Sequence, residues 1–222
     1  MPEPVDALET EVAKTAAFLD ELKPEEWELP TRCPPMSFRE LTVHALRGAY
    51  RITSFLAAPP GEDEPEMDVV TYYRYDPAEV GPDVVKRAQA ESAGRAPDAD
   101  IGAEWREAWA AAIAAAHAAV GDDPVVSSPF GTIRLGEYLK TRCVEVTIHS
   151  MDLLDALGRE PDPSPGGLEV TCDVLRGLLG AELRPLRMEE SRFALTGTGR
   201  AALTGEERAM LGPLADSFPV LQ

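Results

Sequence analysis

Apolar residues recur at intervals of three and four along most of the chain, the spacing that places them on one face of an α-helix. In the first segment, Val5, Leu8 and Val12 begin such a row, which continues to Leu22. Comparable rows predict further helices. The expected helices cover residues 5–22, 37–55, 83–95, 98–120, 135–157 and 168–179. The pattern therefore predicts a mainly α-helical protein.

Prolines and glycines interrupt these rows and mark the connections between helices. Residues 24–35 contain four prolines, which predict a tight, ordered connection rather than a helix. Residues 59–82 are acidic and rich in proline, so we expect a long loop that could cover a pocket. Residues 122–133 are expected to form a turn-rich entry into the next helix.

A domain boundary is expected at residues 158–167, where three alternating prolines predict an extended linker. We expect residues 1–160 to form a helical bundle and residues 161–222 a small C-terminal region. In that region the run from Arg192 to Thr196 is strand-like, and Thr204 with Glu207 three residues later predicts a capped helix. Roughly 60 residues rarely fold alone, so we expect this small α/β appendage to dock on the bundle.

The helix expected at residues 135–157 carries a polar stripe. Five polar residues step by four or three along one face, and apolar residues flank them on both sides. The stripe consists of Tyr138, Arg142, Glu145, His149 and Asp152. A helix that is apolar over most of its circumference is normally buried, and buried carboxylates and imidazoles need partners. We therefore expect the stripe to belong to a buried polar site.

Glu145 and His149 lie four residues apart, so both can contact one ion from successive helical turns. One oxygen and one nitrogen ligand suit zinc or another mid-row divalent metal. The pair alone is a weak signal, but His44 lies on the inward face of the helix at 37–55 and offers a third ligand. The alternative is that both histidines are satisfied core residues. We favour a metal site, because a cation would pair several buried polar groups at once.

Three other motifs have simpler explanations. His117 lies near the end of its helix, where the helix dipole favours a histidine, and contact with the site is the less favoured alternative. Cys33 is interpreted as a structural turn cysteine rather than a reactive thiol, because Arg32 is the only cation near it in sequence. The run from Gly197 to Ala202 matches a dinucleotide-binding turn, but no βαβ unit surrounds it.

Composition narrows the class of partner. The 222 residues include 39 acidic and 21 basic side chains, for a net charge of −18, so we expect neither nucleic acid nor an anionic membrane as partner. No apolar run approaches the roughly 20 residues that span a bilayer, and the N-terminus lacks the layout of a secretory signal. The three cysteines form neither a disulfide framework nor a metal knuckle. We expect a globular, cytoplasmic protein.

Three blocks of sequence carry a family resemblance. They are Trp27-x-x-Pro30-Thr31-x-Cys33-Pro34, Arg142-x-x-Glu145-x-x-x-His149-x-x-Asp152-Leu153-x-x-Ala156-Leu157-Gly158, and Thr196-Gly-Thr-Gly-Arg200. Together with His44 in the helix after the first block, they resemble the mycothiol-dependent maleylpyruvate isomerase family of DinB-like metalloenzymes. The resemblance implies a DinB-like four-helix bundle with a divalent metal, usually zinc, on His44, Glu145 and His149. It also implies that Arg200 is the closest match to an arginine needed for activity.

The chain departs from that family in two places. Where the family often has Cys-Pro-Gly-Trp-Thr, this chain has Cys33-Pro34-Pro35-Met36-Ser37. Its C-terminal region is also shorter than the domain appended to the isomerase. Both changes lie near the expected pocket, so the resemblance leaves the substrate open.

Three protein ligands would leave metal positions open, which is the arrangement of a catalytic site. With the resemblance, this predicts a metal-dependent transferase or isomerase that uses Zn²⁺, or Ni²⁺, and mycothiol or a similar thiol. The bound thiol would be a thiolate and would attack an electrophilic small molecule. Arg142 or Arg200 is expected to pair with a carboxylate of the substrate or cofactor, and Asp152 to contact the cofactor or support the ligands.

Two alternatives stay open. In a metal-dependent hydrolase the metal would hold water, and Asp152 is the only candidate general base on the stripe. A non-catalytic, metal-stabilised bundle would instead bind a ligand or partner without turnover. For the enzyme we expect a thiol cosubstrate and an electrophile as partners, and a monomer or homodimer.

Overall fold

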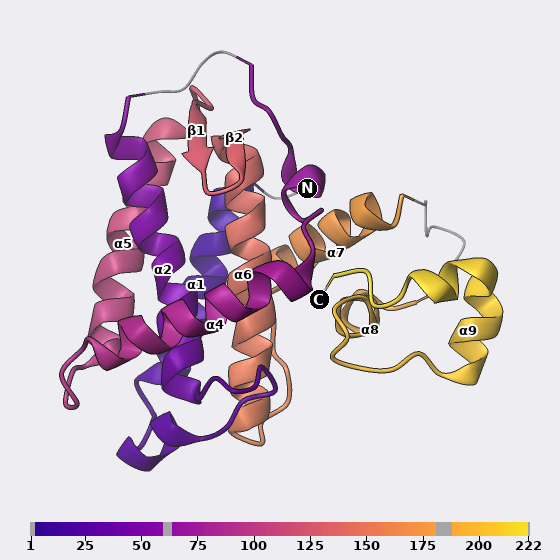
Figure 1. The fold of residues 1–222 in the computed structure, drawn as a ribbon, viewed down its shortest axis with the longest axis horizontal. Helices are drawn as coiled ribbons and strands as arrows, with labels where there is room; N and C mark the ends of the chain where they lie inside the picture. The colour runs from indigo at the N-terminus through magenta and orange to yellow at the C-terminus, as the bar shows by residue number, and fades with distance from the viewer. Residues whose placement is uncertain (1–2, 60–63, 181–187, 222) are drawn as a thin grey trace.

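Four long helices form a bundle in the computed structural model, which describes residues 3–59, 64–180 and 188–221 (Figure 1). They are α1 (Pro4–Leu19), α2 (Phe38–Ala57), α5 (Ile101–Ala119) and α6 (Leu135–Ala156). Both α1 and α2 pack against α5 and α6, and all four helices contribute to one hydrophobic core. The mainly helical bundle that the sequence predicts is confirmed.

Capping contacts set where the helices begin. The Ser37 hydroxyl accepts a hydrogen bond from the Glu40 amide at 3.3 Å, and the Glu40 carboxylate accepts one from the Ser37 amide at 2.8 Å. At α6 the preceding turn satisfies the first amides instead. The Leu135 amide donates to the Pro124 carbonyl at 2.9 Å, and the Gly136 amide donates to Asp123 Oδ1 at 2.7 Å. These contacts fix the start of the helix that carries the polar stripe.

The segment at 59–82 contains more regular structure than a long loop. A short helix, α3 (Val69–Tyr72), lies within it, and α4 (Pro77–Ala93) begins at Pro77 and includes Pro82. The Asp76 carboxylate accepts a hydrogen bond from the Ala78 amide and caps α4. Residues 60–63 lie outside the described residues. Helix α4 packs against α2 on the outside of the bundle.

The predicted turn-rich segment at 122–133 contains an antiparallel hairpin of β1 (Val125–Ser128) and β2 (Gly131–Arg134). Val126 pairs with Ile133, and both side chains are buried in the bundle core. A 3₁₀ turn, η1 (Pro24–Glu28), forms part of the connection between α1 and α2.

The C-terminal region is helical in its described part. Helix α7 (Pro165–Leu179) packs against α1 and α6, and α8 (Glu190–Gly197) packs against α7. The strand predicted at 192–196 is wrong, because these residues lie inside α8. They are followed by α9 (Gly205–Leu211), which has the predicted capping box, and by the 3₁₀ turn η2 (Gly212–Ser217). The domain boundary near residue 160 stays a prediction.

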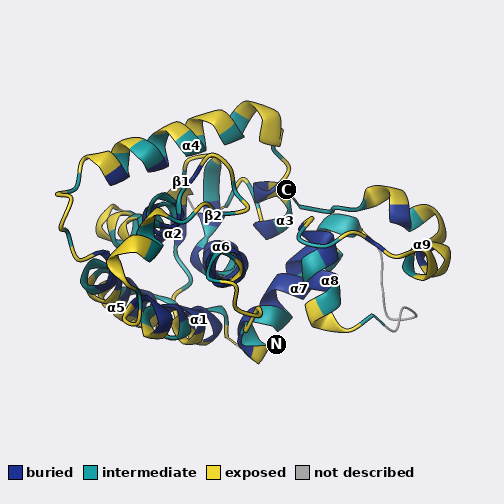
Figure 2. Cartoon of the chain, turned by 90° about the horizontal axis from the view of Figure 1, so that it is seen from below, coloured by how far each residue is buried: buried dark blue, intermediate teal, exposed yellow. Residues whose placement is uncertain are grey.

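Helix α6 lies in the middle of the molecule, surrounded by other helices (Figure 2). Tyr138, Arg142 and Asp152 of its polar stripe are buried, and Glu145 and His149 are half-buried. The expectation that this helix is enclosed is therefore correct. Its polar side chains must find their partners inside the protein.

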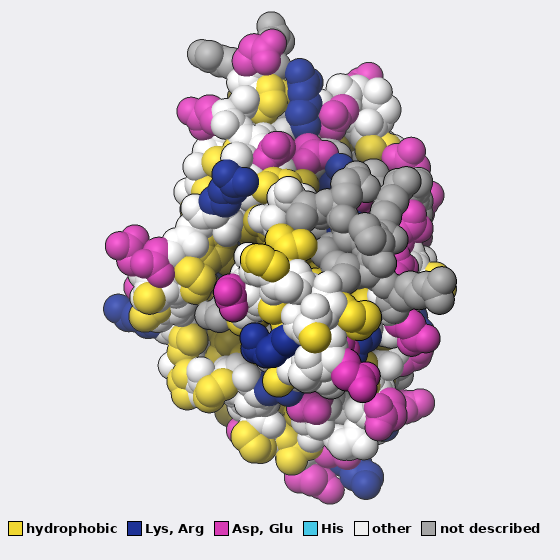
Figure 3. Space-filling model, turned by 90° about the vertical axis from the view of Figure 1, so that its right-hand side faces the viewer, with side chains coloured by type: hydrophobic (Ala, Val, Ile, Leu, Met, Phe, Trp, Pro, Cys, Tyr) yellow, Lys and Arg dark blue, Asp and Glu magenta, His cyan; other side chains and the backbone are white. Residues whose placement is uncertain are grey.

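None of the described helices combines the length and the apolar character needed to cross a membrane. On the face that carries the C-terminal region, acidic side chains are scattered widely and basic ones are fewer (Figure 3). This surface agrees with the net charge of −18.

Candidate metal centre

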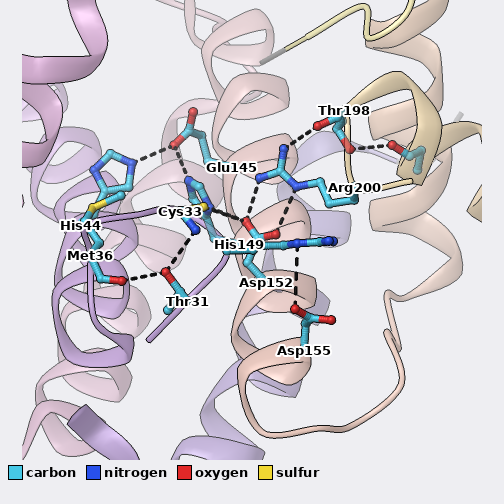
Figure 4. Close-up of polar contacts among 12 residues, drawn as sticks. Thr31, Cys33, Met36, His44, Glu145, His149, Asp152, Asp155, Thr198 and Arg200 are labelled. Carbon is cyan, nitrogen blue, oxygen red and sulfur yellow. Dashed lines mark hydrogen bonds and ion pairs between the residues drawn. The ribbon is translucent and has the colours of Figure 1, made fainter. Parts of the chain in front are cut away.

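Helices α2 and α6 bring His44, Glu145 and His149 together (Figure 4). Glu145 Oε2 lies 3.4 Å from His44 Nε2 and 3.7 Å from His149 Nε2. One ligand atom from each residue lies within 4.8 Å of the other two. Two imidazole nitrogens and a carboxylate oxygen are therefore arranged around a space in which one cation would contact all three.

Burial and neighbouring charges set the protonation of this group. Burial raises the pKa of Glu145. Its hydrogen bond with His44 and the charge of Arg142 lower the pKa by more than burial raises it, so the pKa lies well below its usual range. Burial lowers the pKa of His44. Burial also lowers the pKa of His149, yet its hydrogen bonds with Asp152 and Cys33 outweigh this effect and raise the pKa to about 10. Binding of a divalent cation here would release the proton from His149 Nε2.

Asp152 organises the other side of His149. Its side chain is fully buried, and Oδ2 accepts a hydrogen bond from His149 Nδ1 at 3.1 Å. A carboxylate bonded to Nδ1 fixes the ring orientation and leaves Nε2 for a metal, as is usual for metal-binding histidines. Oδ2 also accepts from the Cys33 thiol at 3.3 Å.

Arg200 reaches the same carboxylate from the C-terminal region. Its Nε donates to Asp152 Oδ1 at 3.0 Å and its Nη2 donates to Oδ2 at 2.7 Å, a two-point contact suited to a guanidinium. A third donor, Nη1, binds the Thr198 carbonyl at 2.7 Å. The structure therefore places Arg200 behind His149, bonded to Asp152.

Two sets of possible ligands share His149, and they differ in how many of their ligand atoms already form hydrogen bonds. In the set of Cys33, His149 and Asp152, the Asp152 oxygens already accept hydrogen bonds from Arg200, His149 and Cys33. This set is a completed hydrogen-bond network. In the set of His44, Glu145 and His149, both Nε2 atoms face one carboxylate oxygen beside a pocket. The donor chemistry and the open side fit a divalent metal there.

Arg142 lies one turn before Glu145 on α6 and contacts tyrosines. Its Nη2 donates to the Tyr72 hydroxyl and its Nε donates to the Thr141 hydroxyl, both at 3.0 Å. The guanidinium carbon lies 5.0 Å from the centre of the Tyr138 ring. Arg142 is therefore held beside the metal-binding group and directed at a pocket.

Two pockets meet at the candidate ligands. A pocket of about 290 Å³ is lined by His44, Glu145 and Arg142 together with aromatic and charged residues from α2, α3 and α4. The other, of about 190 Å³, is lined by His44, Glu145, His149 and Arg200 among mostly apolar side chains. Because His44 and Glu145 line both pockets, molecules that occupied the two pockets would meet at the metal-binding group.

His117 does not reach this site. It is exposed, and its Nε2 lies 2.9 Å from Glu9 Oε2 on the face of α1 and α5. The sequence interpretation also missed the role of Cys33 as a partner of Asp152. The turn that carries Cys33 is built locally: the Cys33 amide donates to the Thr31 hydroxyl at 3.2 Å, and the Met36 amide to the Cys33 carbonyl at 3.0 Å. The available signal was that Cys33 lies in the first of the three blocks that carry the family resemblance.

Comparisons with known proteins bear on the family and the fold of the chain. A family model described as the mycothiol maleylpyruvate isomerase N-terminal domain matches residues 8–154. A crystal structure of the mycothiol-dependent maleylpyruvate isomerase resembles the chain with a TM-score of 0.56 and 17% sequence identity, over 79% of this chain and 70% of that chain. A variant of that enzyme with a histidine replaced by alanine gives a TM-score of 0.52 at the same identity and coverage. No curated protein matches the sequence. At this identity the likeness to the solved structures concerns the fold alone.

Proposed function

The chain belongs to the mycothiol maleylpyruvate isomerase N-terminal domain family, and from this membership we propose that it is a metal-dependent, thiol-dependent transferase or isomerase. The observation that carries the proposal is the convergence of His44, Glu145 and His149 where two pockets meet. A reaction between a thiol and an electrophile needs two binding spaces that share one activating centre. This arrangement supplies both.

In the proposed enzyme, His44 Nε2, His149 Nε2 and a Glu145 oxygen hold the divalent metal, zinc or nickel. When bound there, the metal would stabilise the thiolate form of mycothiol or a similar thiol at neutral pH, which makes it nucleophilic. Three protein ligands leave room for such a molecule.

Asp152 and Arg200 hold His149 in position for metal binding in the proposed enzyme. Asp152 keeps the proton on His149 Nδ1 and holds the ring orientation, and Arg200 fixes Asp152 in turn. Arg200 also lines the smaller pocket. Arg142 lines the larger pocket, where its guanidinium would pair with an anionic group of a reactant. The thiol cosubstrate and the electrophile would thus approach the metal from the two pockets that His44 and Glu145 both line.

The hydrolase alternative loses its proposed general base in this geometry. Asp152 was the only candidate on the stripe, and it is fully buried with three neighbouring residues donating to it. The ion pair with Arg200 and the hydrogen bond with His149 also keep the pKa of Asp152 well below its usual range, despite the opposing effect of burial. A carboxylate held in this way is a poor proton acceptor for an attacking water.

Elemental analysis of the purified protein, combined with a thiol-consumption assay, tests the proposal. Wild type, His44→Ala and Glu145→Ala are compared, and His117→Ala serves as the matched control because His117 lies outside the site. We expect about one zinc or nickel per chain in wild type and in His117→Ala, with loss of metal in the other two. Mycothiol consumption with a panel of small electrophiles should follow the metal content.

Two results would contradict the proposal. A folded wild type that binds no added zinc or nickel would leave the polar stripe as a structural network. Full metal loading without consumption of any thiol would instead support the non-catalytic, ligand-binding bundle.

A further inference from the structure

Four arginines gather around the larger pocket beside the candidate metal ligands. Helix α2 contributes Arg47 and Arg51, α4 contributes Arg87, and α6 contributes Arg142. Arg142 is buried and the other three are half-buried. Such a concentration of guanidinium groups is unexpected in a chain with 39 acidic and 21 basic side chains.

Most of these guanidinium groups lack an anionic partner. Arg47 pairs with Glu91, but its Nε is buried without a hydrogen bond. The side chains of Arg51 and Arg87 make no hydrogen bond or ion pair with any residue in the described ranges. Burial lowers the pKa of Arg47, and the like charges of Arg51 and Arg87 lower it further, which indicates that both of them repel the charge of Arg47.

Arg142 has only neutral partners within hydrogen-bond distance, the hydroxyls of Tyr72 and Thr141. The charge of Glu145 on the same helix also acts on Arg142, and the proposed metal would neutralise that charge. Leaving a buried cation without a counter-ion is unfavourable. The pocket therefore holds guanidinium charge that an anion would balance, and a metal at the site would add to this positive charge.

The carboxylates on the pocket wall do not balance this charge. Glu91 is already paired with Arg47, and Glu145 belongs to the metal-binding group. Glu79 and Asp83 lie at the exposed surface of α4, and within the described residues neither forms an ion pair with a pocket arginine. The interior of the pocket therefore presents guanidinium groups, whose planar donors match carboxylate and phosphate oxygens.

We propose that the pocket bounded by Arg51, Arg87 and Arg142 binds an oxyanion group of the electrophilic substrate, a carboxylate or a phosphate. Arg51 and Arg87 are then specificity-determining residues, and the thiol occupies the smaller, more apolar pocket. The inference rests on the proposed function for the identity of the reactant, but the oxyanion site itself does not depend on it.

Aromatic residues complete the pocket. The Tyr75 and Phe130 rings stack with their centres 5.4 Å apart, and the Tyr72 ring packs edge-on against Phe130 at 5.1 Å. All three side chains line the same space as the arginines. They provide an apolar wall for the uncharged part of a small anion, while the arginines bind its charged end.

Isothermal titration calorimetry with simple anions tests this inference. The probes are succinate and inorganic phosphate, with neutral succinamide as the uncharged comparison, each titrated into metal-free and zinc-loaded protein. The variants are Arg51→Gln and Arg87→Gln. Lys86→Gln is the matched control, because it removes one positive charge from the exposed side of α4 next to Arg87 without changing the pocket lining.

We expect succinate or phosphate to bind wild type and succinamide not to bind. Each arginine variant should lower the affinity for the anion by about tenfold, since each removes a charge-assisted contact. Lys86→Gln should change this affinity less than about twofold, because an exposed charge contributes little. Stronger binding of succinate than phosphate identifies the group as a carboxylate, and the reverse identifies a phosphate. If Arg51→Gln does not fold, Arg87→Gln on the outer helix decides the test.

The inference is overturned if wild type binds neither anion, if both arginine variants bind like wild type, or if Lys86→Gln weakens binding equally. The outcome is separate from that of the proposed function. Anion binding in a protein that takes up no metal would retain the oxyanion site and reject the enzyme proposal. Metal-dependent thiol consumption without anion binding would do the opposite.

Discussion

At the scale of single residues, Asp152 joins three parts of the chain through one buried carboxylate. Its partners are Cys33 in the turn before α2, His149 on the same helix and Arg200 in the C-terminal region. A buried carboxylate is stable when several donors satisfy it and a cation balances its charge. The orientation of His149 depends on this balance.

Replacing Asp152 tests that dependence. In Asp152→Asn the neutral side chain leaves the Arg200 guanidinium buried without its counter-ion, and it no longer holds His149 through a charged contact. We expect metal affinity to fall by roughly 10–100-fold, as for other partners of metal-binding histidines, and the free energy of unfolding to fall by about 3 kcal/mol. Competition with a chromophoric chelator measures the first effect, and urea denaturation the second.

The matched control is Asp155→Asn. Asp155 lies on the same helix, but its side chain is 54% exposed and its nearest cationic partner, Arg32, is 3.8 Å away. Both the metal affinity and the stability of this variant should stay close to those of wild type. An unchanged metal affinity in Asp152→Asn, or an equal loss in both variants, would remove Asp152 from the metal-supporting role.

Residue spacing could predict part of this site and not the rest. His44, Glu145 and His149 follow from helical periodicity, because each lies at a fixed step from apolar neighbours on its own helix. The contacts of Asp152 with Cys33 and Arg200 join residues 119 and 48 positions apart, respectively. No local pattern encodes pairings of that length, so Cys33 was interpreted as a turn residue.

At the scale of elements, the long helices and the capped helix α9 could be predicted, whereas the short helices α3 and α8 could not. The run from Arg192 to Thr196 is too short to distinguish the two periodicities. In α8 the buried residues are Phe193, Ala194, Thr196 and Gly197, a helical spacing that faces α7. Pro82 was interpreted as the end of a loop, yet it lies in the second turn of α4, where the loss of one amide donor was tolerated.

The start of α7 is held by a buried acid on α1. The Glu11 side chain is fully buried, and Oε1 accepts a hydrogen bond from the Ser164 amide at the N-cap of α7. A Cβ atom at position 167 would come within 2.4 Å of Glu11 Oε1, so a larger residue there would displace the Glu11 side chain. Glu11 Oε2 has no hydrogen-bond partner among the described residues. The carboxylate is therefore only partly satisfied.

This arrangement predicts a pH-dependent stability. Burial raises the pKa of Glu11 above its usual value of 4.5, and the hydrogen bonds from Ser164 offset this only in part. The folded state therefore binds the proton more tightly than the unfolded state, so the contribution of Glu11 to the free energy of unfolding falls as the pH rises above 4.5. Glu11→Gln cannot ionise. We expect it to be more stable than wild type at pH 7, with a difference that disappears below pH 4.5.

Urea denaturation of wild type and Glu11→Gln between pH 4 and pH 8 measures this difference. Glu25→Gln is the control for the loss of one negative charge, because Glu25 is exposed in η1. Its stability difference from wild type should show little pH dependence. A Glu11→Gln variant that is less stable than wild type at pH 7 would show that the ionised carboxylate stabilises the junction of α1 and α7.

At the scale of the whole molecule, α7 connects two hydrophobic clusters. Val170 and Val174 pack into the bundle core, whereas Cys172 and Leu175 pack with the helices that follow. Arg200, which follows α8, adds a polar contact between the C-terminal region and α6. These contacts cross the boundary predicted near residue 160, so a change at the metal-binding group should alter the stability of both parts of the chain.

The net charge of −18 complicates any metal-binding experiment, because cations also accumulate at an acidic surface. Asp6, Glu9 and His117 form an exposed group that could hold a metal ion weakly. The candidate centre differs because its ligands are half-buried rather than exposed. They come from α2 and α6, which are far apart along the chain, so the unfolded state does not present them together. A metal bound there therefore stabilises the folded state, by about 2.7 kcal/mol when its free concentration is 100 times the Kd.

We therefore expect the Tm of wild type to rise with added zinc and to return on chelation. Glu145→Gln should abolish the rise, because it removes a ligand that both histidines face, while His117→Ala should retain it. Differential scanning calorimetry at fixed ionic strength measures these shifts, and Glu25→Gln controls for the lost charge. If the rise survives in Glu145→Gln but is lost in His117→Ala, the metal binds the exposed group between α1 and α5. The half-buried cluster of α2 and α6 would then be a hydrogen-bond network that holds two helices together without a metal.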